Sequence, residues 1–324
     1  MSTKTESPSS DPAVDRRSFL TVASAVMATA TIPLASSSSS QVMAQTKAAE
    51  SKSSSTTVQL DKRTPQLWQV TIANPPFNLV VPEMVSALHS VVKEMDNDQE
   101  LKVLLIKSAT AGFFINHFDL GKAQDFPMEA GDPPLPSWVD LVLRLSKSPV
   151  ISIACVRGRT RGGGNEFSLA CDLRYASREK AQFGQPEVGA GILPGGGGSE
   201  RLPRLIGRDR ALEIILSSQD YGAEDAERFG LVTRALPDNE LDPYVESLAG
   251  RLCDFDKQAL AAAKAQVYRA TLAPDADLQA AYAEYSESLM WPGFQARRPR
   301  MAKLAAEHGA DIELRLGHYL GLAN

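Results

Sequence analysis

The sequence predicts an α/β core followed by a helical C-terminal region, and two observations lead to that prediction. From residue 57 to residue 236, short apolar runs suited to strands alternate with stretches of helical periodicity. Such alternation is typical of strands that pair largely in parallel within an α/β layer. Beyond residue 236 the regular patterns are helical and rich in alanine. We therefore expect a mixed core of roughly 180 residues that carries a helical tail of roughly 90.

Local patterns justify the elements of the core. Residues 103–106, Val-Leu-Leu-Ile, are apolar throughout, as expected for a strand that is covered on both faces. Pro82 fits the start of a helix, where its missing N–H has no intrahelical partner in any case. By the same reasoning we expect further strands at 67–73, 150–156 and 173–176, and helices at 82–95, 137–145 and 164–171.

The tail predicts four helices, at 241–252, 257–270, 275–290 and 300–308. Amphipathic helices of this kind more often pack on their own core or on a partner subunit than on nucleic acid. Within the core, residues 121–136 are rich in proline, glycine and acidic residues and predict a long loop. Such a loop is either a roof over a substrate pocket or a solvated surface loop, and the sequence leaves both open.

Composition narrows the classes of function. The chain has 324 residues, 43% of them hydrophobic, which is ample for one sizeable core. Its net charge of -5 argues against a dedicated nucleic-acid binder, which would usually be basic. The three cysteines, Cys155, Cys171 and Cys253, include no Cys-x-x-Cys pair. They therefore support neither a disulfide framework nor a zinc site, and we expect buried free thiols.

Residues 1–56 predict a signal and a disordered linker that precede the folded part. Arg16-Arg17-Ser18-Phe19-Leu20 is followed by a mildly apolar run, a serine tract and small residues around position 44. This order resembles an export signal of the twin-arginine type, which carries folded proteins and implies a periplasmic address. If the signal is not used, the protein stays in the cytoplasm. Because no other apolar stretch approaches the ~18 residues of a bilayer span, we expect none in the mature chain.

Two glutamates carry the most specific chemical signal. Glu166 follows a run of three glycines, and Glu187 follows Phe-Gly-Gln-Pro. Segments of this kind can bring backbone N–H groups close to a small reacting group. Two carboxyl groups beside exposed N–H donors are the parts needed to move protons around a polarised carbonyl. The sequence therefore favours an acid–base enzyme.

The chain resembles the crotonase (enoyl-CoA hydratase/isomerase) superfamily over residues 71–236. The resemblance rests on an ordered series of motifs: Ile-Ala-Asn-Pro-Pro-Phe-Asn at 72–78, Phe-Ile-Asn-His-Phe-Asp-Leu at 114–120, Arg-Gly-Gly-Gly-Asn-Glu at 161–166, Ala-Cys-Asp at 170–172, Phe-Gly-Gln-Pro-Glu-Val-Gly at 183–189, the glycine-rich stretch 194–207, and the pieces at 223–226 and 230–232. It implies a spiral of strand–strand–helix units, with the crotonase core at 57–236. It also implies a helical oligomerisation region at 237–324 and a homotrimer or homohexamer.

The resemblance also implies roles for single residues. The N–H groups of Asn116 and Gly163 would form an oxyanion hole for a thioester carbonyl, since fixed donors stabilise the charge of an enolate. Glu166 would activate water, and Glu187 would protonate Cα. Coenzyme A would enter as part of the substrate, with no permanently bound cofactor. The reading is thus a lyase, an enoyl-CoA hydratase-like enzyme that adds or removes water across a 2-enoyl thioester.

Two departures from the family pattern leave alternatives open. Where relatives usually have glycine, this chain has His117, which would either narrow the pocket, take part in the chemistry or point away. Arg157, Arg159 and Arg161 alternate before the glycines and could project to one side of a strand. They would clamp an anionic group of the substrate or form ion pairs at a subunit interface. No metal is expected, because His117 and Asp119 have no further histidine or cysteine ligand nearby.

These departures motivate two other functions. The first is a crotonase-fold hydrolase or C–C bond enzyme acting on a non-CoA carboxylate or diketone, with Arg159 and Arg161 holding the carboxylate. It would resolve the tension between a cytoplasmic coenzyme and an export signal. The second is a non-catalytic crotonase-fold binding protein, motivated by the altered Asn116-His117 segment alone.

Overall fold

A six-stranded sheet forms the centre of the molecule. The computed structural model describes residues 56–131 and 134–323, so the predicted signal and linker lie, apart from residue 56, outside the described residues. The strands of the sheet are, in spatial order, β1 (Val58–Thr64), β2 (Leu67–Ile72), β3 (Val103–Ser108), β7 (Ile151–Val156), β9 (Leu173–Ser177) and β12 (Arg234–Leu236). Only the β1–β2 pair is antiparallel, which confirms the largely parallel layer expected from the sequence.

Both faces of this sheet are covered, as the apolar run in β3 predicted. Leu104 and Ile106 pack on one side with the helices α2 (Pro82–Asn97) and α3 (Ser137–Lys147). Val103 and Leu105 pack on the other side against α9 (Asp238–Cys253). Successive side chains of a strand point to opposite faces, so a strand with helices on both sides must be apolar at every position.

A second sheet of four short strands determines where the functional residues lie. Its order is β11 (Asp220–Gly222), β10 (Gln182–Gly184), β8 (Arg159–Arg161) and β4 (Phe113–Ile115). The strands β4, β8 and β10 are parallel, whereas β11 runs antiparallel to β10. The carboxyl ends of β4, β8 and β10 therefore meet at one edge, and the residues that follow each strand come together there.

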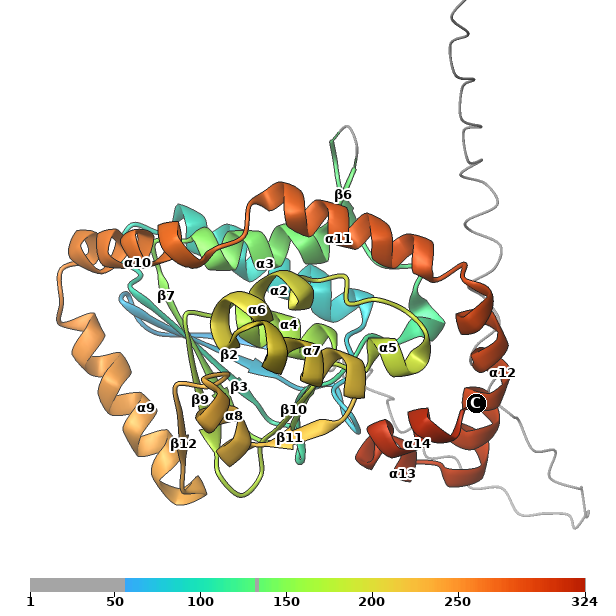
Figure 1. The fold of residues 1–324 in the computed structure, drawn as a ribbon. Helices are drawn as coiled ribbons and strands as arrows, with labels where there is room; N and C mark the ends of the chain where they lie inside the picture. Colours follow the sequence, from blue (N-terminus) through green and yellow to red (C-terminus); the bar gives the residue numbers. More distant parts are fainter. Residues whose placement is uncertain (1–55, 132–133, 324) are drawn as a thin grey trace, which may run out of the picture.

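The remaining core elements connect and cover the two sheets. They are α4 (Gly163–Ala170), α5 (Glu187–Ala190), α6 (Gly198–Ile206), α7 (Arg208–Ser217) and α8 (Ala223–Phe229). The stretch 121–136, predicted to be a loop, contains the end of a short 3₁₀ helix (Leu120–Lys122) and a small hairpin of β5 (Met128–Glu129) and β6 (Leu135–Pro136). The hairpin projects at the top of Figure 1.

The tail is helical, as predicted, and it wraps around the core. After α9 come α10 (Lys257–Thr271) and α11 (Asp275–Ser288), which run along the top of Figure 1, with α11 packed on α3 and α6. Then α12 (Pro292–His308) turns down the side to α13 (Asp311–Leu314) and α14 (Leu316–Leu322), which packs on α5. In the described ranges, 56–131 and 134–323, no helix has the length and apolar character needed to cross a bilayer.

The predicted helix at 300–308 begins too late. In the structure α12 starts at Pro292 and continues through Pro299. A proline inside a helix removes one backbone hydrogen bond and usually kinks or ends the helix, so the sequence pattern favours a start after Pro299, whereas α12 tolerates Pro299 in its interior. The thiols follow the prediction more closely: all three cysteines are free, Cys155 and Cys171 are buried, and Cys253 is partly buried.

Candidate active site

Glu166 lies in the first turn of α4, directly after the strand β8. Gly162 precedes the helix with a φ of 51°, a conformation that favours glycine. The carboxyl group of Glu166 is buried, and its Oε1 accepts hydrogen bonds from the N–H groups of Gly196 (2.9 Å) and Gly198 (3.0 Å). Burial raises the pKa of Glu166, while the two N–H donors and the Arg201 guanidinium oppose that rise.

Glu187 begins α5 and follows the strand β10. A Cβ on Gly162 would stand 2.6 Å from Glu187 Oε1, so the carboxyl group lies directly against the Gly162 backbone. Glu187 Oε2 is buried and has no hydrogen-bond partner among the described residues. Burial and the charge of Glu166 raise the pKa of Glu187 to about 8. The structure therefore brings the two predicted glutamates into one site, where Glu166 accepts N–H hydrogen bonds from the glycine-rich stretch and Glu187 Oε2 has no partner among the described residues.

The glycine-rich stretch after α5 holds Glu166 through its backbone. A Cβ on Gly196 would stand 2.4 Å from Glu166 Oε2 and 2.6 Å from Trp138 Nε1, so only glycine fits there. Arg201 is buried beneath this stretch and donates to the Gly196 carbonyl at 3.1 Å. The stretch thus binds a carboxylate through its backbone N–H groups.

The oxyanion donors predicted from the sequence differ in their availability. Gly163 N–H lies at the start of α4 and has no acceptor among the described residues. Asn116 N–H donates to the Asn78 carbonyl at 2.9 Å, so in this geometry it is engaged within the chain. The next N–H, that of His117, has no acceptor in the described part of the chain. One free N–H is therefore present on each of the two predicted segments.

His117 is held in place through both of its ring nitrogens. Nδ1 lies 3.0 Å from the Phe118 carbonyl, and Nε2 lies 3.0 Å from Oε2 of Glu313 on α13. Burial alone would lower the pKa of His117, but the Glu313 carboxylate outweighs it and raises that pKa. Burial alone would raise the pKa of Glu313, but the His117 imidazolium and the hydrogen bond from Asn116 outweigh it and lower that pKa to about 2. The imidazole therefore binds its own chain and is part of a partly buried ion pair with Glu313.

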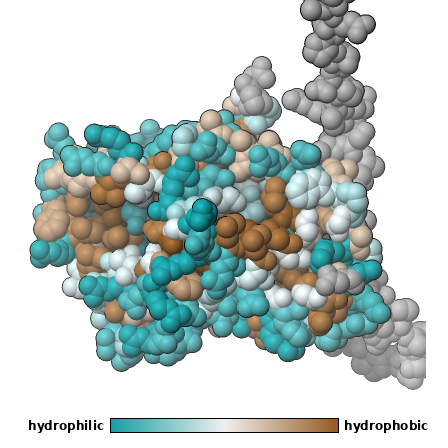
Figure 2. All heavy atoms as spheres, in the orientation of Figure 1, coloured by the Kyte–Doolittle hydropathy of each residue, from teal (hydrophilic) through white to brown (hydrophobic). Residues whose placement is uncertain are grey.

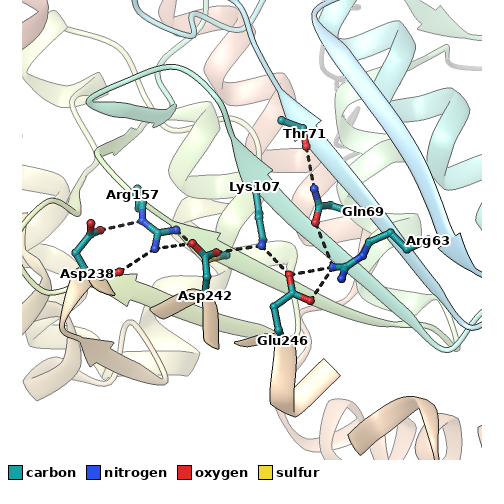
Figure 3. Close-up of polar contacts among 9 residues, drawn as sticks. Arg63, Gln69, Thr71, Lys107, Arg157, Asp238, Asp242 and Glu246 are labelled. Atoms are coloured by element: carbon teal, nitrogen blue, oxygen red, sulfur yellow. Dashed lines mark hydrogen bonds and ion pairs between the residues drawn. The ribbon is translucent and has the colours of Figure 1, made fainter. Parts of the chain in front are cut away.

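The three arginines of β8 and its approach do not act together. Arg157 binds Asp238 and Asp242 on α9, within the network that Figure 3 shows between α9 and the large sheet. Arg161 is 1% exposed and is paired with Asp220 on β11. These ion pairs lie within the chain, whereas the sequence suggested a subunit interface or a substrate. They fasten α9 and β11 to the core.

Arg159 is more open than Arg161. It donates to the Leu314 carbonyl at 3.1 Å and lies 5.6 Å from the centre of the Phe113 ring. It lines a cavity of about 540 Å³ beside α13 and α14, a cavity that neither Glu166 nor Glu187 lines. Arg159 therefore faces a different space from the two glutamates.

Aromatic rings cover the start of α4. The Phe118 ring packs directly on Gly163, where a Cβ would stand 2.4 Å from its edge. Its centroid lies 4.9 Å from that of Phe126 and 5.0 Å from that of Trp138. Phe126 belongs to the stretch 121–136, so this stretch contributes to the wall of the site. Of the two alternatives open from the sequence, a roof over a pocket agrees better with this contact.

Among the described residues, one group has the geometry of a possible metal site, and it lies elsewhere. His89, Glu129 and Asp140 bring ligand atoms within 4.8 Å of one another. Each carboxylate already has a cationic partner besides the histidine: Lys93 binds Glu129, and Arg144 binds Asp140. The group is an ion-pair network between α2, α3 and the small hairpin, with its ligand atoms already engaged.

Four residues of the site were not predicted from the sequence. Trp138 on α3 and Glu200 on α6 lie near Glu166, and burial raises the pKa of Glu200 to about 7. Tyr285 on α11 packs on Gly195, and its pKa is raised by burial and by both glutamates. Glu313 on α13 binds Asn116 and His117. Trp138, Tyr285 and Glu313 come from helices outside the motifs, whereas Glu200 lies within the glycine-rich stretch 194–207.

Two neighbouring carboxyl groups whose pKa values are raised by burial, next to a helix-start N–H that has no acceptor among the described residues, are typical of an acid–base enzyme. The comparisons agree. The sequence profile described as enoyl-CoA hydratase/isomerase matches residues 62–290. The chain belongs to the enoyl-CoA hydratase/isomerase family, and it is enoyl-CoA hydratase-like.

Individual relatives support the same assignment. A short-chain-enoyl-CoA hydratase of Clostridium acetobutylicum is 33% identical over 203 residues, which cover 62% of this chain and 77% of that protein. A crotonyl-CoA hydratase of Syntrophomonas wolfei is 34% identical over 191 residues, or 58% of this chain and 72% of that protein. A crystal structure attributed to an enoyl-CoA hydratase from Streptomyces avermitilis superposes with a TM-score of 0.75 at 37% identity, covering 82% of this chain and 96% of that one. The predicted fold class, a crotonase-like α/β spiral with a helical C-terminal region, is confirmed.

Proposed function

We propose that the protein hydrates a 2-enoyl thioester, and that the reverse dehydration uses the same groups. The observation that carries this proposal is the difference between the two glutamates. Glu166 accepts two N–H hydrogen bonds, which favour its ionised form, whereas burial and the nearby charge keep Glu187 protonated with a pKa of about 8. A base and an acid that coexist at neutral pH are what hydration requires.

The steps follow from these protonation states. The Glu166 carboxylate takes a proton from water as the water oxygen bonds to Cβ. The electron pair of the Cα–Cβ double bond moves toward the thioester oxygen, where the N–H of Gly163 and one N–H of the Asn116–His117 segment stabilise the enolate. The enolate then collapses as the Glu187 carboxylic acid gives its proton to Cα. A proton passing from Glu166 to Glu187 restores the starting state.

Coenzyme A enters this proposal as part of the substrate, with no permanently bound cofactor. The names of the relatives support a CoA thioester. The alternative with a free carboxylate held by Arg159 and Arg161 has less support, because Arg161 is buried in an ion pair with Asp220 and Arg159 faces a different cavity. The alternative of a non-catalytic binding protein does not account for two neighbouring glutamates whose pKa values are both raised by burial.

The test is hydration of crotonyl-CoA, followed by the loss of the enoyl absorbance, with the chain from residue 45 onward. Glu166→Gln and Glu187→Gln should each lower kcat by about 10²–10⁴-fold, since each removes one proton-transfer group. Glu200→Gln is the comparison variant, because Glu200 is a partly buried glutamate near Glu166 to which the proposal assigns no step. A parent without turnover, or variants with parental turnover, would remove the proposal.

We also propose self-association into a homotrimer or homohexamer. Leu212 and Leu216 on α7 are 46% and 61% exposed, and Val267 on α10 is 61% exposed. Figure 2 shows apolar surface over α5 and α7. Exposed leucines and valines in clusters are typical of protein contacts. Light scattering of Leu216→Glu and Val267→Glu would show which face is used, and a monomeric parent would contradict the proposal.

Export by a twin-arginine-type signal remains a proposal that rests on Arg16, Arg17, Phe19 and Leu20. Fractionation of cells that produce the full chain would test it. The protein should appear in the periplasm, and replacement of both arginines with lysine should retain it in the cytoplasm. A cytoplasmic parent would contradict the proposal and would agree with a CoA substrate.

A further inference from the structure

A contact from the far end of the chain holds the segment that carries one oxyanion donor. Glu313 Oε2 lies 2.8 Å from Asn116 Nδ2 and 3.0 Å from His117 Nε2. The Glu313 carbonyl in turn accepts from Arg161 at 2.5 Å. The Glu313 carboxylate therefore binds two consecutive side chains of the segment, and its backbone is fastened to β8.

This contact lies outside the features that define the family. The matched profile ends at residue 290, and Glu313 is 196 residues from His117. His117 places a ring in this segment, and the fold has to accommodate that ring. Both nitrogens of the ring are engaged, one by the Phe118 carbonyl and the other by Glu313. The side chain thereby fixes the backbone that glycine would leave free.

We propose that Glu313 is a positioning residue of the hydration reaction: by binding Asn116 and His117 together, it fixes the backbone N–H that polarises the thioester carbonyl. The inference rests on the proposed function. An oxyanion donor works only if it is already in place when charge develops, because reorientation during the step costs free energy. Glu313 supplies from α13 the rigidity that the segment would otherwise lack.

The surroundings of His117 indicate what else a change at Glu313 would alter. Glu313 on α13, Arg161 on β8 and Glu187 on α5 are the charged groups that interact with the imidazole. Removal of the Glu313 charge leaves the repulsion from Arg161 and so weakens the hold on the imidazolium. The imidazole pKa should fall, which can be followed by NMR because the chain has only four histidines.

The decisive comparison is Glu313→Gln against Asp311→Asn. Both residues lie on the same short helix, but Asp311 binds Arg315 and Tyr319 of the tail and does not contact the Asn116–His117 segment. We expect Glu313→Gln to lower kcat by about 10²-fold, as a displaced catalytic group does, with KM changed less than about threefold. Asp311→Asn should keep the parental kcat even if it loosens the tail.

A second measurement reports how strongly the backbone N–H polarises the thioester carbonyl, and it does not depend on turnover. The carbonyl stretch of a bound thioester, labelled with ¹³C at the carbonyl, moves to lower frequency when the carbonyl is polarised. We expect that shift to shrink in Glu313→Gln and to persist in Asp311→Asn. Should Glu313→Gln prove unstable, His117→Gln removes the same ion pair from its other side and is measured in the same way.

The outcomes separate the inference from the proposed function. Parental turnover with an unchanged kcat and carbonyl shift in Glu313→Gln would overturn the role of Glu313 and leave hydration intact. An equal loss in Asp311→Asn would show that only general anchoring of the tail matters, which also overturns the inference. A parent with neither turnover nor carbonyl shift would refute the proposed function, and the inference would fall with it.

Discussion

The proton on Glu187 leads to the sharpest prediction, an alkaline limit on activity. Burial and the charge of Glu166 raise the pKa of this carboxyl from 4.5 to about 8. At about 1.4 kcal/mol for each pH unit, that difference corresponds to about 5 kcal/mol in favour of the protonated form. At pH 7 about nine in ten of these groups would carry a proton, compared with fewer than about one in a hundred for an ordinary glutamate.

The perturbation is pH itself, and the assay is kcat/KM for crotonyl-CoA from about pH 5 to about pH 10. Because Glu187 must donate a proton, kcat/KM should fall tenfold per pH unit above about 8. Glu166 must be ionised, so its raised pKa sets an acidic limb above 4.5. The profile should therefore be a bell. A profile that stays level to about pH 9.5, or whose alkaline fall already begins below about pH 6, would refute the assignment of the acid.

The neighbouring carboxyl group of Glu200 could produce a similar alkaline limb in the pH profile. Burial raises the pKa of Glu200 to about 7, and Glu200 interacts with Glu166. In Glu200→Gln the alkaline limb should remain near pH 8 if Glu187 is the acid, and it should disappear if Glu200 is the acid.

Protonation of Glu187 also makes the free energy of unfolding depend on pH. Since the pKa of folded Glu187 is raised, its contribution is fully present below about pH 4.5 and is lost as pH rises through about 8.

Three further substitutions test the surroundings of the site. Lys264→Met removes the buried ammonium that lies 2.9 Å from Asp172 Oδ2, so urea unfolding should show a loss of about 3 kcal/mol, and an unchanged midpoint would contradict the pairing. Gly196→Ala would place a methyl group 2.4 Å from Glu166 Oε2, so kcat should fall more than about tenfold with the fold retained. A parental kcat would show that the backbone of the glycine-rich stretch shifts to make room for the methyl group. Arg161→Met should cost about 3 kcal/mol of stability and leave KM for a neutral thioester unchanged, whereas a raised KM at full stability would favour a role in substrate binding.

The elements that the sequence predicted well are those whose physics is local. The apolar run of β3 requires cover on both faces wherever it lies, and both faces are covered. The glycines before Glu166 require a tight turn into a helix, and α4 begins there after Gly162 with a positive φ. Motif residues that follow parallel strands were brought together because the strand ends coincide, a consequence of pairing that needs no knowledge of distant contacts.

The elements that the sequence could not predict depend on partners far along the chain. The arginines of β8 were expected to act as a group, since alternate positions share a side of a strand. Yet Arg161 is paired with Asp220, 59 residues away, and Arg157 with Asp238, 81 residues away. Glu313 has no motif and acts through a contact that exists only after the tail has docked. The local sequence pattern does not show which of several acidic residues will form an ion pair with a buried arginine.

The meeting of β4, β8 and β10 at one edge has a consequence for how such an enzyme can change. Each strand leads to one part of the site: β4 to the Asn116–His117 segment, β8 to the helix start with Glu166, and β10 to Glu187. Each strand is held by its own ladder of hydrogen bonds, so the residues after one strand can be replaced while the other two functions keep their places. The site is in this sense modular, and a change at His117 stays within a single module. New chemistry on this fold can therefore arise one strand end at a time.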